Sequence, residues 1–167
     1  SDRVCSRWEI VEQIDTVRPR SVFLSYVHED ADTIQRIQKD LEQRGIRVWK
    51  DTDSIKGSER WRVSIENGIR ACDYFMPCFS KQAASPSNYM LTELEKMRSE
   101  DWNRQGKRDG NNWIIPVRIE ECDIPDFPIA EKHRNLRDIQ WIDLFEPKGW
   151  EAGIKEILRI VWKPKNP

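Results

Sequence analysis

The order of apolar and amphipathic segments along this chain is the feature that most restricts its fold. A short β-rich run at 20–26 (RSVFLSY) is followed by a helical pattern at 29–45, where isoleucine and leucine recur every three or four residues. Further strand patterns cover 46–49, 71–80, 113–119 and 139–145, and further helical patterns cover 60–70, 86–97 and 150–162. Strands and helices therefore alternate along almost the whole sequence.

This alternation predicts an α/β fold, in which an open parallel sheet carries helices on both of its faces. Five strands suggest the flavodoxin-like, doubly wound, five-stranded parallel sheet with strand order 2-1-3-4-5. Its strands would be buried on both faces, which fits their apolar character. Pro77 lies inside the third strand pattern and lacks a ladder donor, so we expect it near the end of that strand or at a bulge.

The length of 167 residues predicts a single domain. We expect residues 1–19 to form a helical extension or linker, residues 20–162 the domain itself, and residues 163–167 a tail. The sequence begins at Ser1 rather than at Met, which is consistent with an excised domain of a longer protein.

Charge and hydropathy exclude several classes of partner. The formal net charge is -1. Charged residues make up 34% of the chain, and both signs are interspersed, so we expect no direct nucleic-acid partner. No apolar run approaches the ~20 residues that a membrane helix needs, so we expect no membrane partner. The sequence contains neither the glycine pattern of dinucleotide-binding folds nor a P-loop, which argues against hydride transfer and against ATP hydrolysis.

The cysteines and histidines give no metal-ligand spacing. The four cysteines form no CxxC pair and the two histidines lie far apart, so we predict no metal site. Free thiols are typical of a reducing compartment, and we expect a cytoplasmic protein. A Cys–His nucleophile pair stays open as an alternative, although no flanking signature supports it.

Polar segments follow the strand patterns at the edge where ligands bind in doubly wound sheets, outside the carboxyl ends of the strands. These segments are SYVHED, KDTDSIKGSE and SKQAASPSNY. The third strand ends in CFSK without an aspartate, which argues against a phosphate-accepting response regulator. Ser85 and Pro86 are typical of a helix start, and Glu93 lies about two turns into that helix, within reach of the same edge.

Four segments in order resemble TIR domains, the Toll/interleukin-1 receptor/resistance family, of the bacterial type. They are SVFLSYVHED, then RVWKDTDSIKGSERWRVSIENGIRACDYFMPCFSK, then SNYMLTELEKM, then NNWIIPVRI. The resemblance runs from about Ser21 to about Phe145 and includes the last helical pattern. It implies an enzyme that cleaves the nicotinamide–ribose bond of NAD+, which is then the substrate, with no further cofactor.

The family's catalytic glutamate matches Glu93, and the aromatic residue four positions earlier, commonly Trp, is Tyr89 here. Glu95 is the alternative carboxylate, about 200° around the helix from Glu93. The remaining substrate contacts that we predict are Phe23, Ser25, Tyr26, Asp51 and Trp61. Each has a structural alternative, because large aromatics commonly fill cores and aspartates commonly form turns.

The resemblance leaves more than one function open. The product could be ADP-ribose or a cyclic ADP-ribose isomer, and family members of this kind are activated by self-assembly, commonly as effectors of bacterial immunity. Self-association would use the loop Lys50 to Glu59. The main alternative is a non-catalytic TIR–TIR signalling scaffold. A nucleoside deoxyribosyltransferase-like enzyme, which shares the fold and an active-site glutamate, is a third possibility.

Overall fold

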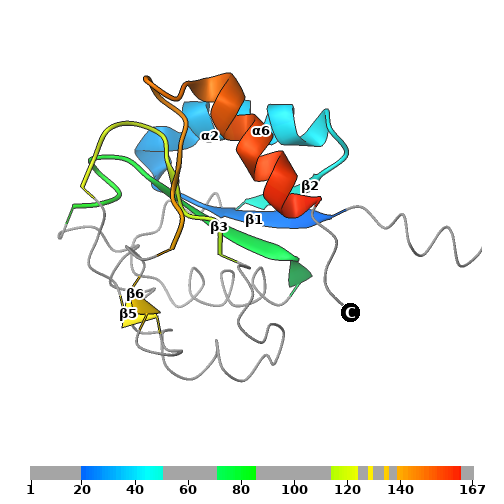
Figure 1. The fold of residues 1–167 in the computed structure, drawn as a ribbon, viewed down its shortest axis with the longest axis horizontal. Coiled ribbons are helices and arrows are strands. Elements are labelled where there is room, and N and C mark those ends of the chain that lie inside the picture. The colour runs from blue at the N-terminus through cyan, green and yellow to red at the C-terminus, as the bar shows by residue number, and fades with distance from the viewer. Residues whose placement is uncertain are drawn as a thin grey trace, which may run out of the picture.

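The computed structural model describes residues 20–50, 71–85, 114–123, 128–129, 134–135 and 139–162. Its main element is a five-stranded parallel sheet with the order β2-β1-β3-β4-β7 (Figure 1). The strands are β1 (Ser21–Ser25), β2 (Arg47–Lys50), β3 (Tyr74–Phe79), β4 (Val117–Arg118) and β7 (Ile142–Asp143). Because β7 is the fifth strand of this sheet along the chain, the predicted order 2-1-3-4-5 is confirmed.

Two helices cover one face of the sheet. A short 3-10 turn, η1 (His28–Asp30), leads into α2 (Ala31–Glu42), and α6 (Trp150–Val161) lies beside α2 (Figure 1). Both agree with the helical patterns in the sequence. The patterns at 60–70 and 86–97 lie outside the described residues.

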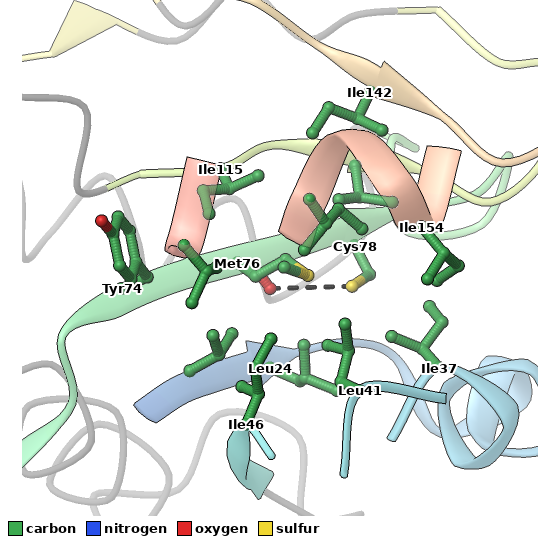
Figure 2. Close-up of a cluster of buried hydrophobic side chains, with 14 of the residues drawn as sticks. Leu24, Ile37, Leu41, Ile46, Tyr74, Met76, Cys78, Ile115, Ile142 and Ile154 are labelled. Atoms are coloured by element: carbon green, nitrogen blue, oxygen red, sulfur yellow. Dashed lines mark hydrogen bonds between the residues drawn. The ribbon is translucent and has the colours of Figure 1, made fainter. Parts of the chain in front are cut away.

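The core lies between these helices and the sheet (Figure 2). Alternate residues of the central strands face it, and the apolar stripes of the helices complete it. Its fully buried members include Val22, Leu24, Ile34, Ile37, Leu41, Met76, Cys78, Val117, Ile142, Ile157 and Val161. The spacing of three and four residues in α2 is therefore the spacing of one buried helix face.

The opposite face of the sheet is buried as well. Phe23 and Phe75 stack there with ring centroids 6.0 Å apart, and Phe79 packs on Trp141 at 5.1 Å. All three phenylalanines are buried. The central strands β1 and β3 are thus buried on both faces, which explains their continuous apolar sequence runs, whereas the edge strand β2 is partly exposed.

Gly45 ends the first helical segment. Its φ of +80° is the left-handed conformation that glycine adopts most readily. The N–H of Gly45 donates to the carbonyl of Glu42, and the N–H of Ile46 donates to the carbonyl of Leu41. This pair of bonds is the Schellman motif, and the buried side chains of Ile46 and Leu41 supply its apolar contact.

Pro77 lies toward the end of β3, whose last residue is Phe79, as predicted, and the strand has no bulge at this position. Phe75 pairs with Ile114 and Cys78 pairs with Val117, so the register between the two segments is the same on both sides of Pro77. On that register a regular ladder would place the missing N–H of Pro77 opposite the carbonyl of Ile115. The named strand β4 starts only beyond this point, so the sheet accommodates the proline by an interrupted ladder.

A second sheet lies apart from the first in the connection before β7. It is a two-stranded antiparallel pair, β5 (Pro128–Ile129) and β6 (Arg134–Asn135) (Figure 1). Among the described helices, neither α2 nor α6 is long and apolar enough to cross a membrane.

We expect Gly153→Ala to destabilise the domain, because α6 contacts β7 at this glycine. An added Cβ would lie 2.6 Å from the backbone oxygen of Asp143 and 2.4 Å from a methyl carbon of Leu144. Overpacking costs about 1–3 kcal/mol, and a contact this close to a backbone oxygen falls in the upper part of that range, about 2–3 kcal/mol, because the backbone cannot rotate aside as a side chain can. The better helix propensity of alanine offsets ~1 kcal/mol, so we expect a net loss of about 1–2 kcal/mol. Urea unfolding measures this loss.

The exposed Ala152→Gly variant is the matched control, since it changes helix propensity in α6 without changing a packing contact. A Gly153→Ala protein as stable as the wild type would contradict the close approach of α6 to β7.

Candidate active site

The strand order places the switch point of this sheet between β1 and β3. From β1 the chain runs to β2 on one side, whereas β3, β4 and β7 follow on the other. In doubly wound sheets, ligands bind at the carboxyl ends of the strands beside such a point. The described residues that reach it are the end of β1, the turn η1 and the end of β3.

Ser25 is the last residue of β1 and lies directly at this edge. It is 1% exposed and pairs with Pro77 in the ladder between β1 and β3. Within the described structure, its hydroxyl makes no hydrogen bond. A buried hydroxyl without a partner costs free energy, and such groups cluster where a protein binds something. Ser25 stays a predicted substrate contact, and this geometry is compatible with that role.

Phe23 and Tyr26, the other two predicted substrate contacts in this segment, lie on opposite faces of the sheet. Phe23 shares the face of Ser25 and is only 3% exposed, because it stacks on Phe75. Tyr26 is partly buried and packs against the core beneath α2 and α6. The two aromatic side chains therefore do not come together, and both remain untested as substrate contacts.

A hydrogen bond between Asp30 and Ser80 crosses the switch point. The Ser80 hydroxyl, at the end of β3, donates to the Asp30 carboxylate after β1 over 2.6 Å. The same hydroxyl accepts the N–H of Ala83 at 3.2 Å. Sequence reasoning noted the acidic residues after the first strand and the serine ending the third, but did not pair them.

The Asp30 carboxyl lies in an unusual electrostatic environment for a surface loop. Partial burial raises its pKa, the hydrogen bond from Ser80 lowers it, and the negative charges of Glu120 and Glu29 raise it further. The net shift is upward from 3.8. Glu120 itself accepts the N–H of Lys81 at 2.8 Å, so the loops after β1 and β4 both hold the start of the turn after β3.

Away from the switch point, on the other side of β3, Arg118 and Asp143 form a bidentate ion pair between β4 and β7. The guanidinium donates from Nε at 2.7 Å and from Nη2 at 2.8 Å, and its third nitrogen donates to the carbonyl of Cys122 at 2.8 Å. The bond to Asp143 is the main cause that raises the pKa of Arg118. This cation is therefore already neutralised, which argues for a structural role.

Cys78 and Cys122 do not support a thiolate nucleophile. None of Cys72, Cys78 and Cys122 forms a disulfide bond in the described structure. Burial raises the pKa of Cys122 to about 11 and raises the pKa of Cys78 even further, so both are protonated near neutral pH. In the same residues, no group of three or more histidine, cysteine, aspartate or glutamate side chains could hold a metal ion.

Four of the predicted site residues, Asp51, Trp61, Tyr89 and Glu93, and the alternative Glu95, lie outside the described residues. The loop Lys50 to Glu59 is described only at Lys50, the last residue of β2. Trp49, next to it, is 53% exposed on this edge strand.

Comparison with known families identifies the chain. The family model described as TIR domain matches residues 22–158. The chain belongs to the TIR domain family. The match confirms the resemblance carried by the four sequence segments, and it falls within the predicted domain at 20–162, whose outer limits stay a prediction.

Among curated proteins, this TIR domain is similar to the NAD(+) hydrolase TcpA of Theionarchaea archaeon (strain DG-70-1). The two are 25% identical over 145 residues, which is 85% of this chain. The match covers 40% of the relative, so the chain spans about two-fifths of that protein's length.

Two solved structures are similar to this chain. A prokaryotic SEFIR domain superposes with a TM-score of 0.55 at 16% identity, over 89% of this chain and 97% of that one. The TIR domain of the Toll-related receptor TRR-2 from Hydra magnipapillata gives a TM-score of 0.48 at 17% identity, over 82% and 98%. The first of these supports the shared fold of the TIR domain described here.

We expect wild-type stability to rise relative to that of Asp30→Asn as the pH falls from about 7 to about 4. The raised pKa means that the folded state takes up the Asp30 proton at a higher pH than the unfolded state does. Ionised Asp30 therefore destabilises the fold above that pKa, and acid relieves the cost, which the asparagine never incurs.

Urea unfolding of both proteins across this pH window measures the difference. Asp32→Asn, which removes an exposed carboxylate from the start of α2, is the control for the loss of one charge. If the unfolding free energy of the wild type minus that of Asp30→Asn stayed constant or fell on acidification, the raised pKa would be refuted.

Proposed function

We propose that this TIR domain cleaves the bond between nicotinamide and ribose in NAD+, with Glu93 as its catalytic residue. The observation that carries this proposal is the likeness to a named NAD(+) hydrolase over 85% of the chain. The buried hydroxyl of Ser25 at the switch point, which has no hydrogen-bond partner in the described part of the chain, supports it, since a substrate oxygen or hydroxyl could act as the partner.

The chemistry needs only one carboxylate. The nicotinamide ring leaves with the electron pair of the breaking C–N bond and becomes neutral, so no acid has to protonate it. Ordinary glycosidases instead use two carboxyl groups, one of which protonates the leaving oxygen. In the proposed reaction, Glu93 stabilises the positive charge that develops on the ribose and bonds its hydroxyls.

The product depends on the group that attacks the ribose carbon. Attack by water gives ADP-ribose and a proton, whereas attack by a nitrogen of the adenine ring gives a cyclic ADP-ribose isomer. Both reactions use the same first step and the same glutamate. We propose that the protein has this hydrolase or cyclase activity as an effector of bacterial immunity. We place it in the cytoplasm, a reducing compartment in which cysteine thiols stay reduced.

We further propose that the active form is a self-assembly through the loop Lys50 to Glu59. The feature that favours this is Trp49, a large apolar side chain 53% exposed on the edge strand β2 just before that loop. Exposed tryptophans are enriched among the residues that dominate binding energy in interfaces. The same surface would serve a non-catalytic signalling scaffold.

We expect Glu93→Ala to abolish nicotinamide release, because the variant loses the charge that stabilises the transition state. The assay is chromatographic separation of NAD+, nicotinamide and ADP-ribose species at high protein concentration with a crowding agent. Loss of one preorganised electrostatic group should lower kcat by roughly 100-fold or more. Glu95→Ala is the matched control on the same sequence segment and should retain turnover.

The outcomes separate the candidate functions. Equal loss in both variants, with the fold intact by circular dichroism, would contradict the assignment to Glu93 alone. No turnover by the wild type in any assembled condition would instead favour the scaffold. Exchange of free bases between deoxynucleosides would indicate the deoxyribosyltransferase-like activity.

We expect Trp49→Ala to weaken self-association by about tenfold or more, since it removes a large apolar contact. Sedimentation over a concentration series measures the change. Trp162→Ala is the control, because Trp162 is the other exposed tryptophan of the described residues, 47% exposed, and follows α6. Equal weakening in both variants, or in neither, would place the contact elsewhere.

A further inference from the structure

The turn that follows β3 is built on the hydroxyl of Ser80. The carbonyl of Ser80 accepts the N–H of Ala84 at 2.9 Å, and its hydroxyl accepts the N–H of Ala83 at 3.2 Å. Ser80 therefore caps a single helical turn, as serine commonly does at a helix start. The chain continues from this turn through Ser85, and Glu93 follows eight residues later.

The orientation of that cap is set by Asp30. A hydroxyl has one hydrogen, and in Ser80 it points to the Asp30 carboxylate over 2.6 Å, the length of a strong charge-assisted bond. This leaves a lone pair directed at Ala83. Ser80 is 1% exposed, so without Asp30 its hydrogen would have no partner among the described residues and the hydroxyl could rotate away.

A second carboxylate holds the same turn from the other side. Glu120, after β4, accepts the backbone N–H of Lys81 at 2.8 Å. The first residues of the turn are thus fixed both to the loop after β1 and to the loop after β4. The turn is held at the sheet edge where the proposed substrate would bind.

We propose that Asp30 is a positioning residue for NAD+ cleavage, which acts by holding Ser80 and so fixing the turn that leads to Glu93. This inference rests on the proposed function. It assigns Asp30 no contact with the substrate, because its role is fulfilled through Ser80. Small displacements of a catalytic group are costly: a shift of about 1 Å can lower a rate on the order of 100-fold.

A second serine–aspartate pair in the same sheet provides a control for this proposal. At the opposite edge, the Ser21 hydroxyl donates to the Asp73 carboxylate at 3.1 Å, and the Asp73 N–H donates back to that hydroxyl at 3.0 Å. This pair joins the first residue of β1 to the residue just before β3, with the same chemical groups as the pair of Asp30 and Ser80. It lies at the amino edge, away from the candidate site.

The experiment compares kcat and KM for NAD+ in the assembled protein, at a temperature where every variant is folded by circular dichroism. We expect Asp30→Ala and Ser80→Ala to lower kcat by about tenfold to 100-fold with KM changed by less than about threefold. Asp30→Asn keeps an acceptor for the Ser80 hydroxyl and should restore kcat to within about threefold of the wild type. Asp73→Ala should lose stability but keep kcat.

Two results would overturn the positioning role. One is a kcat of Asp30→Ala no lower than that of Asp73→Ala. The other is an Asp30→Asn protein as slow as Asp30→Ala, which would mean that the charge itself acts on the reaction.

Hydrogen exchange by mass spectrometry separates this proposal from the proposed function. We expect Asp30→Ala, but not Asp73→Ala, to speed amide exchange at Ala83 and Ala84 by about tenfold or more, since their bonds to Ser80 loosen. A wild type without turnover, or with turnover independent of Glu93, would refute the proposed function, while faster exchange in Asp30→Ala would still show that Asp30 holds the turn through Ser80. Unchanged exchange at these two amides would refute the positioning role whatever the activity.

Discussion

The parallel pairing of β1 with β3 is the constraint on which the rest of the described structure depends. Every residue of both strands is buried, so neither strand can shift its register without moving apolar side chains out of a packed core. The pair is also joined at both edges by a serine–aspartate hydrogen bond. The helices α2 and α6, and the outer strands, pack onto this fixed centre.

The sequence predicts this architecture well where the spacing of apolar residues within one segment determines the secondary structure. The spacing of Ile34, Ile37 and Leu41 predicts α2 because those positions share one buried helix face, and Gly45 ends the segment because its left-handed φ suits glycine. Pro77 shows the limit of such rules. Its cost depends on what lies opposite in the neighbouring strand, which a local pattern does not contain.

The candidate site also contains features that the sequence predicts and features that only the folded sheet determines. That Ser25 lies at a ligand-binding edge follows from the strand order, which the alternation of elements predicts. The bond between Asp30 and Ser80 joins residues 50 positions apart, and the pair of Arg118 and Asp143 joins residues 25 apart. A local pattern could offer these polar residues as candidates, but only the packed sheet chooses their partners.

The two edges of the sheet then differ in one physical respect. At the amino edge, Ser21 and Asp73 satisfy each other through side chain and backbone. At the carboxyl edge, the Ser25 hydroxyl stays buried without a partner in the described residues, and Asp30 keeps a carboxyl whose pKa burial raises. Natural sequences tolerate such costs mainly at functional sites. The unfavourable polar groups therefore gather at the edge where the strand order independently predicts a ligand.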